Sequence, residues 1–223
     1  MDLKLLSQAL IKLVLGVALV ALLIFVPAGT LRFWNGWLLM VVLFIPMLGA
    51  GLVMFLKAPE LLRRRLNAKE RQSEQKGVIA WSGVLFAAAF VLAGLGYRFA
   101  WPILPRGWCL AFAAVFLIGY ALFGEVLREN EYLSRTVEVQ EGQSVVDTGL
   151  YGRVRHPMYA ATVLMFLSMP LILGSVCGSL VMLGYLPVLA VRIRGEEALL
   201  RQELRGYDAY MQKVKYRLIP YIW

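Results

Sequence analysis

The feature that most constrains the fold is a series of apolar runs, each about as long as a bilayer is thick. The runs are separated by short charged or turn-rich stretches and extend over Ala9–Val26, Trp37–Leu56, Val78–Gly96 and Trp108–Leu127. A helix needs about 17–25 apolar residues to cross a hydrocarbon core of about 30 Å. Inside that core only helices and closed barrels satisfy the backbone polar groups. The sequence therefore predicts an all-α, polytopic integral membrane protein.

A further apolar stretch, Met158–Ile193, is too long for a single crossing. As one straight helix its roughly 36 residues would be about 54 Å long. Gly174-Ser175, with Cys177-Gly178-Ser179 beside it, indicates a turn that divides the stretch into two legs of about 16 residues, which are short for spanning. We expect four spanning helices, then a helical hairpin at 158–193 that begins and ends on the same side, then a cytoplasmic C-terminal segment.

The distribution of charge predicts the orientation of these helices. With the N-terminus in the cytoplasm, every one of the 23 Lys and Arg residues except Arg32, Arg98 and Arg106 lies on the cytoplasmic side, as the positive-inside rule requires. The charged loop Lys57–Lys76 is then an amphipathic connector on the lipid headgroups. Topology and anionic lipid thus account for the net charge of +9, and we expect no nucleic-acid partner.

Composition excludes other classes. The chain has 60% hydrophobic and 17% charged residues, whereas soluble domains average about 45–50% and roughly 25%. Cys109 and Cys177 have no paired spacing, which argues against a disulfide framework or a redox motif. His156 is the only histidine, and zinc sites usually use several His or Cys ligands. We therefore expect no metal.

Two groups of polar residues flank the hairpin. Pro157 suits the first turn of a helix, which places Arg155 and His156 at a helix N-terminus, where anions bind well. At the other end of the hairpin stand four charged side chains, Arg192, Arg194, Glu196 and Glu197. Because the hairpin returns to its starting side, both groups should face one small volume. A zwitterionic, positively charged cofactor requires that combination of charges.

The same residues carry a resemblance to a known family. The stretch GLYGRVRHPMY (Gly149–Tyr159), the pair Glu196-Glu197, and GYDAYMQKVKYRLIP (Gly206–Pro220) resemble the isoprenylcysteine carboxyl methyltransferase family and are similar to the related phospholipid methyltransferases. The resemblance covers roughly Gln140 to Pro220. It divides the chain into N-terminal transmembrane helices, 1–127, and a methyltransferase core, 128–223.

The resemblance implies that S-adenosyl-L-methionine binds on the cytoplasmic face. The implied cofactor-binding residues are Gln140, Ser144, Val145, Val146, Tyr151, Arg155, His156, Pro157, Met158, Tyr159, Glu196 and Glu197. Arg194 matches a substrate-side arginine, and Arg192 is possible because the register there is open by a residue or two. Arg194, Glu197 and His156 are the residues expected to act in catalysis.

The implied function is methyl transfer at the membrane to a lipophilic acceptor. A sulfonium methyl is already activated, so alignment and exclusion of water can suffice without a catalytic base. A guanidinium in the substrate position favours a carboxylate acceptor. The alternatives are phospholipid N-methylation, thiol S-methylation and, in another class, a non-catalytic membrane transport or assembly protein.

Overall fold

In the computed structural model the described residues are 3–66, 73–130, 132–133 and 139–223, with the side chains of 73–75 left out. Every regular element in these ranges is a helix, and an isolated bridge joins Ile103 to Ser175. The helices are α1 (Leu3–Ala28), α2 (Trp34–Lys57), α3 (Pro59–Leu66), α4 (Ser73–Arg98), α5 (Arg106–Glu129), α6 (Pro157–Ile172), α7 (Val176–Met182), α8 (Tyr185–Glu203) and α9 (Tyr207–Lys213). The predicted all-α membrane fold is confirmed.

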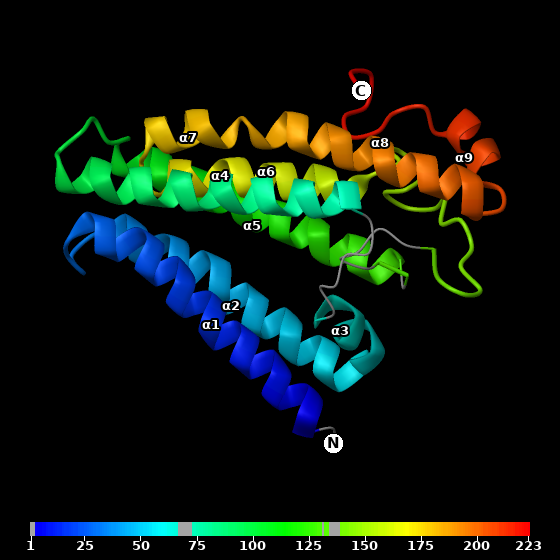
Figure 1. The fold of residues 1–223 in the computed structure, drawn as a ribbon, viewed down its shortest axis with the longest axis horizontal. Helices are drawn as coiled ribbons and strands as arrows, with labels where there is room; N and C mark the ends of the chain where they lie inside the picture. Colours follow the sequence, from blue (N-terminus) through cyan, green and yellow to red (C-terminus); the bar gives the residue numbers. More distant parts are fainter. Residues whose placement is uncertain (1–2, 67–72, 131, 134–138) are drawn as a thin grey trace.

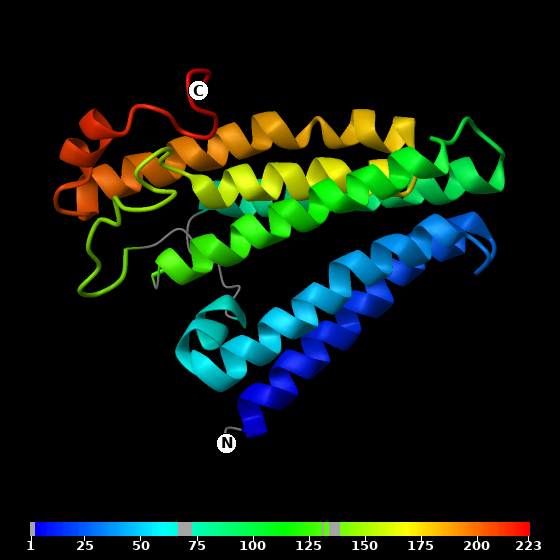
Figure 2. The same ribbon diagram turned by 180° about the vertical axis from the view of Figure 1, so that it is seen from behind.

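The helices form two groups that meet at one end of the molecule. The α1–α2 hairpin diverges from the bundle of α4, α5, α6, α7 and α8, and the views from both sides agree on this (Figures 1 and 2). The hairpin joins the bundle mainly where α1 packs on α4. There a Cβ on Gly94 would lie 2.5 Å from the Ile24 carbonyl oxygen, so only glycine allows this close approach. The N-terminus, α3 and α9 all lie at the opposite end.

Among the described residues, five helices are long and apolar enough to cross a membrane: α1, α2, Lys76–Arg98, α5, and the α7–α8 segment Val176–Glu203. The α7–α8 segment is longer than the second leg of about 16 residues that the sequence predicts. The apolar residues end near Ile193, but the helix continues through the charged residues that follow, so the segment reaches 28 residues. The first leg, α6, is a shorter apolar helix of 16 residues.

The hairpin turn lies at Gly174, as predicted. Its φ of +76° is in the left-handed region, which only glycine adopts without strain. The Ser175 hydroxyl then caps α7 by accepting a hydrogen bond from Gly178 N. The expectation that Cys177-Gly178-Ser179 also belong to the turn is wrong, because this cap starts α7 immediately and places all three inside the helix.

The loop predicted over Lys57–Lys76 is partly helical. Its first half forms α3, whose Leu62 is buried while Arg63 and Arg64 are exposed, the amphipathic arrangement that the sequence predicts. The Arg65 guanidinium lies 5.1 Å from the centre of the Phe123 ring, which links α3 to α5. Residues 67–72 of this loop lie outside the described residues.

Candidate active site

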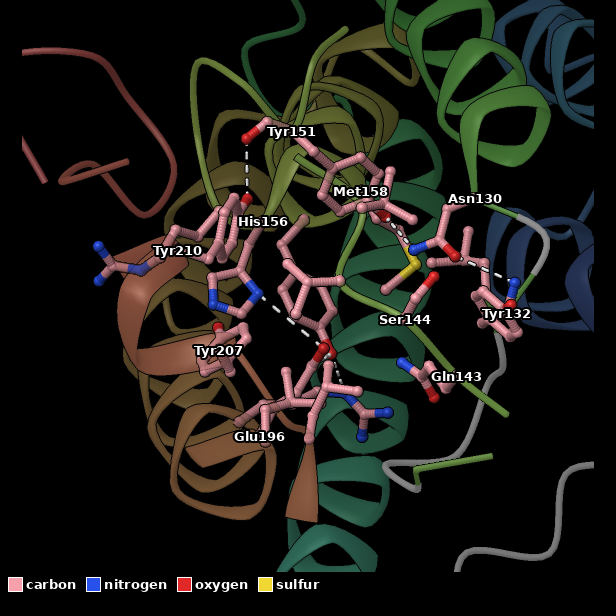
Figure 3. A pocket seen from close by; sticks show the side chains of 18 residues that line it. Asn130, Tyr132, Gln143, Ser144, Tyr151, His156, Met158, Glu196, Tyr207 and Tyr210 are labelled. Atoms are coloured by element: carbon pink, nitrogen blue, oxygen red, sulfur yellow. Dashed lines mark hydrogen bonds and ion pairs between the residues drawn. The ribbon is translucent and has the colours of Figure 1, made fainter. Parts of the chain in front are cut away.

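A cavity lies beside the start of α6, at the end of the molecule that carries α9 (Figure 3). It has about 840 Å³ of empty space, its open mouth included. Side chains from the end of α5, the connector 139–156, α6, α8 and α9 surround it. They are Asn130, Tyr132, Leu133, Gln143, Ser144, Val145, Val146, Tyr151, Arg155, His156, Met158, Tyr159, Arg192, Glu196, Leu200, Leu204, Tyr207 and Tyr210.

Pro157 begins α6 as predicted, and the two residues before it are buried. The chain there pairs with the C-terminal segment: Arg155 N donates to the Tyr216 carbonyl at 2.8 Å, and His156 N to the Arg217 carbonyl at 2.9 Å. These two N–H groups are therefore not available to an anion. The side chains of both Arg155 and His156 line the cavity.

Glu197 holds these two side chains in place. Its Oε1 accepts a hydrogen bond from Arg155 Nε at 2.8 Å and lies 3.2 Å from His156 Nε2. Its Oε2 accepts from Arg217 Nε at 2.9 Å. Glu197 is 4% exposed and is not part of the cavity lining. The carboxylate expected to contact the cofactor thus lies behind the cavity wall, in contact with Arg155 and His156.

Glu196, the other member of the acidic pair, faces the cavity. It accepts a hydrogen bond from the Tyr159 hydroxyl, which in turn accepts one from Arg192 Nε at 2.9 Å. The His156 ring stacks on the Tyr159 ring with centroids 5.6 Å apart. The result is a connected row, Arg192–Tyr159–Glu196, that spans the wall between α6 and α8.

Three buried tyrosines complete one side of the cavity. Tyr210 donates its hydroxyl hydrogen to the Tyr151 carbonyl at 2.8 Å, and Asn130 Nδ2 donates to the Tyr151 hydroxyl at 3.0 Å. Burial raises the pKa of Tyr151, Tyr207 and Tyr210, so all three stay protonated at neutral pH. These bonds attach the connector to both α5 and α9.

The connector is anchored at two further points. Both carboxylate oxygens of Glu129, at the end of α5, accept from Leu150 N at 2.9 and 3.2 Å. Gly149, with φ +53°, lets the carboxylate approach this closely. Lys213 Nζ lies 2.7 Å from an Asp147 carboxylate oxygen, and its hydrogen bond lowers the pKa of Asp147. Residues 134–138, which precede the connector, lie outside the described residues.

The structure brings most of the predicted site residues together. Those that line the cavity are Ser144, Val145, Val146, Tyr151, Arg155, His156, Met158, Tyr159, Arg192 and Glu196. Pro157 and Glu197 are buried outside the lining. Gln140, at the start of the connector, is outside the lining and donates from Nε2 to the Tyr132 carbonyl at 2.6 Å. Arg194 is exposed and outside the lining, so of the two candidate arginines it is Arg192 that borders the cavity.

Sequence reasoning did not assign several lining residues to the site. These are Asn130, Tyr132, Leu133, Gln143, Leu200, Leu204 and Tyr207. Leu200 could have been predicted, because it follows Glu196 by about one helical turn and so lies on the same helix face. Tyr207 and Tyr210 stand in the stretch that carries the resemblance, but nothing in the sequence shows that α9 folds back against the connector.

A second, mostly apolar cavity adjoins the first. It lies between α4, α6 and α8 and has about 730 Å³ of empty space, its open side included. The lining residues are Val78, Ile79, Ser82, Tyr159, Thr162, Phe166, Tyr185, Leu189 and Arg192. Tyr159 and Arg192 belong to both linings. They form a shared wall between a cavity lined by charged side chains and an apolar one.

The chain is similar to known proteins over part of its length. A family model described as phospholipid methyltransferase matches residues 108–205, from the start of α5 to the end of α8. The resemblance to membrane methyltransferases is therefore confirmed for this segment. Over 91 residues the chain is also 31% identical to Delta(14)-sterol reductase TM7SF2 of Mus musculus. That match covers 40% of this chain and 22% of the reductase, so the chain spans about a fifth of that relative's length.

Proposed function

We propose that this chain, which resembles phospholipid methyltransferases over residues 108–205, is an S-adenosylmethionine-dependent methyltransferase that acts on a lipophilic acceptor. One observation carries the proposal: a charged cavity and an apolar cavity share the wall formed by Tyr159 and Arg192. A reaction between a polar donor and a lipophilic acceptor requires such a pair of adjoining sites.

The residues of the charged cavity fit the cofactor. Glu196 supplies a negative charge for the sulfonium and ammonium groups, and Arg155 a positive charge for the carboxylate. Asn130, Gln143 and Ser144 supply neutral donors and acceptors for the adenosine part. In Figure 3 these three lie on the opposite side of the cavity from His156, Tyr207 and Tyr210.

The apolar cavity suits the hydrocarbon part of an acceptor. Val78 and Ile79 of α4, Phe166 of α6 and Leu189 of α8 line it, and these helices belong to the apolar bundle. A lipid that enters between α4 and α8 would keep its chain in apolar surroundings and bring its polar head to Arg192. Because lipid tails are as apolar as this lining, the chain moves from the bilayer into the cavity at little cost, and the contact of the polar head with Arg192 distinguishes the acceptor.

The protein's part in the reaction is to bind, orient and exclude water. When bound, S-adenosylmethionine supplies a methyl group that its sulfonium has already activated. Arg192 holds an anionic acceptor head at the shared wall, and Tyr159 fixes the Arg192 guanidinium through a 2.9 Å hydrogen bond. Orientation of this kind contributes several kcal/mol to a barrier, about 7–11 at most.

Among acceptors we favour a carboxylate, which gives an O-methyl ester. Arg192 borders both cavities, and a guanidinium binds a carboxylate through paired hydrogen bonds while it repels an amine cation. The runner-up is N-methylation of an aminophospholipid, which the name of the matching family favours. In that case Glu196 would attract the amine and accept its proton. A thiol acceptor is the third possibility.

Calorimetric titration of the purified protein with S-adenosylhomocysteine tests the cofactor assignment. Micromolar binding supports a methyltransferase, whereas no binding rejects it and favours a transport or assembly role. A parallel titration with NADP⁺ tests the reaction named by the sterol reductase relative, because nicotinamide nucleotides are the usual hydride donors of reductases. Binding of NADP⁺ alone would replace our proposal with a reductase.

The acceptor class is tested by methyl transfer in membranes. Radiolabelled S-adenosylmethionine is supplied with lipophilic acids, thiols and aminophospholipids in turn. Base-labile label on an acid supports ester formation, and base-stable label confined to aminophospholipid rejects it. Arg192→Ala should abolish transfer to the acid, whereas the matched control Arg194→Ala, on the exposed face of α8, should retain it. Loss of transfer in the Arg194 variant alone would return the substrate role to that residue.

The site lies at the end of the molecule that carries α3 and the N-terminus (Figure 1). Since the basic residues cluster there, we propose that the site faces the cytoplasm, where S-adenosylmethionine is available.

A further inference from the structure

The Tyr207 side chain carries a hydroxyl for which the described part of the chain supplies no hydrogen-bond partner. Tyr207 is 4% exposed, and its hydroxyl oxygen is fully buried without a hydrogen-bond partner among the described residues. Buried hydroxyls nearly always have a partner, because an unsatisfied one loses its hydrogen bonds to water without replacement. A buried, unpaired donor in the lining of a cavity indicates a group that binds there.

The neighbouring tyrosine shows what a structural hydroxyl in this helix does. Tyr210 lies one turn further along α9, lines the same cavity and packs on Tyr207 with ring centroids 5.7 Å apart. Its hydroxyl donates to the Tyr151 carbonyl and thereby attaches α9 to the connector. Both rings belong to one apolar cluster with Leu204 and Val214. The two rings thus share one packing role, but of the two hydroxyls only that of Tyr207 lacks a hydrogen-bond partner among the described residues.

The surroundings of the hydroxyl identify the part of the ligand that would meet it. The charges that act on it come from Glu197, Glu196 and Arg155, and in Figure 3 Tyr207 lies next to His156 and Glu196. The neutral amide and hydroxyl groups lie on the opposite side of the cavity. This charged end matches an amino-acid group, which carries both a carboxylate and an ammonium, and not a neutral base.

We propose that the Tyr207 hydroxyl donates a hydrogen bond to the carboxylate of the cofactor's amino-acid part, which makes Tyr207 a ligand-binding residue. The proposal rests on the proposed function, because it takes S-adenosylmethionine as the ligand. The phenol suits the task. Burial, followed by the nearby Glu197 and Glu196, raises the pKa of Tyr207, so the O–H stays protonated and donates over the whole physiological pH range.

The test measures binding of two ligands that differ only in the proposed contact. S-adenosylhomocysteine contains the amino-acid part, and 5′-methylthioadenosine lacks it. Tyr207→Phe should weaken binding of S-adenosylhomocysteine about tenfold, or about 1.4 kcal/mol, and leave binding of 5′-methylthioadenosine within twofold of wild type. Tyr97→Phe serves as control, because Tyr97 stacks on Phe33 near the C-terminal end of α4, away from the cavity. It should leave both affinities unchanged.

Thermal unfolding without ligand separates a binding role from a structural one. Tyr207→Phe should unfold at the same temperature as wild type or higher, because it removes an unsatisfied buried hydroxyl. Tyr210→Phe should unfold at a lower temperature, because it removes the bond to the Tyr151 carbonyl.

Three results would overturn the proposal: unchanged affinity of Tyr207→Phe for S-adenosylhomocysteine, an equal loss for both ligands, or a fall in unfolding temperature as large as that of Tyr210→Phe. If wild-type protein binds neither ligand, the proposed function fails as well, which distinguishes that failure from a wrong assignment of Tyr207.

Discussion

Glutamine in place of Glu197 should destabilise the fold, whereas the same change at Glu196 should weaken ligand binding. The Glu197 carboxylate is buried and lies within 2.8 Å of both Arg155 and Arg217 and 3.2 Å from His156. Removal of one partner from a buried ion pair costs about 3–5 kcal/mol, because the remaining charge is left uncompensated. Glutamine keeps one acceptor oxygen, which places Glu197→Gln near 3 kcal/mol.

For a chain of this length each kcal/mol corresponds to a shift of about 2–4 °C in unfolding temperature. Glu197→Gln should therefore unfold roughly 6–12 °C below wild type. Glu196 is different: its side chain is 24% exposed, and its described contacts are the Tyr159 hydroxyl and, at 4.0 Å, the His156 ring. Glutamine still accepts from that hydroxyl, so the loss of stability should stay below about 1 kcal/mol.

Thermal unfolding in detergent and titration with S-adenosylhomocysteine, applied to both variants, measure the two effects separately. The expected pattern is a low unfolding temperature for Glu197→Gln, and a near-normal one with about tenfold weaker binding for Glu196→Gln. Tenfold corresponds to about 1.4 kcal/mol. Equal unfolding temperatures for Glu197→Gln and wild type would refute the structural role of that carboxylate. Normal ligand affinity in Glu196→Gln would show that Glu196 does not face the cofactor.

Three further predictions concern the turn, the topology and the connector. Gly174→Ala should destabilise the hairpin by at least about 1–2 kcal/mol in thermal unfolding, because φ is +76° and the new Cβ would lie 2.4 Å from Ile103 Cγ2; unfolding at the wild-type temperature would contradict this. A cysteine at the exposed position Arg32 should react with a membrane-impermeant reagent added outside, and one at the exposed position Ser144 should not; the reverse pattern would place the site outside. Gly149→Ala should displace Glu129, since its Cβ would overlap that carboxylate, and should weaken S-adenosylhomocysteine binding at least fivefold by the same titration; unchanged affinity would show that the connector tolerates the shift.

Much of the fold was predictable from two simple quantities, the length of apolar runs and the position of glycine. Hydrocarbon thickness fixes the length of a crossing, so the long apolar helices α1, α2, α4 and α5 follow from the sequence. Gly174 marks the turn because few other residues adopt its backbone conformation. A hairpin that returns to its starting side must bring His156 near the acidic pair, and His156 Nε2 indeed lies 3.2 Å from Glu197.

The parts that were not predictable depend on contacts between segments far apart in the sequence. The C-terminal segment supplies carbonyls to the backbone N–H groups of Arg155 and His156, and Arg217 completes the shell around Glu197. No local sequence pattern predicts these contacts, because polar residues at a membrane surface are equally compatible with exposure to water. The fold-back of α9, which brings Tyr207 and Tyr210 into the cavity, is of the same kind.

Helix geometry alone decides which of the two arginines shares a face with Glu196. Residues four apart lie on one face of a helix, so Arg192 and Glu196 share a face, and Leu200 continues it. The structure has all three in the cavity lining. Ile193 and Glu197 form the adjacent, buried face. Arg194 is about 200° around the axis from Arg192 and is exposed. If Glu196 faces the ligand, Arg192 must face it too, because both lie on the same face of α8. The carboxylate that contacts the cofactor therefore also determines which arginine contacts the acceptor.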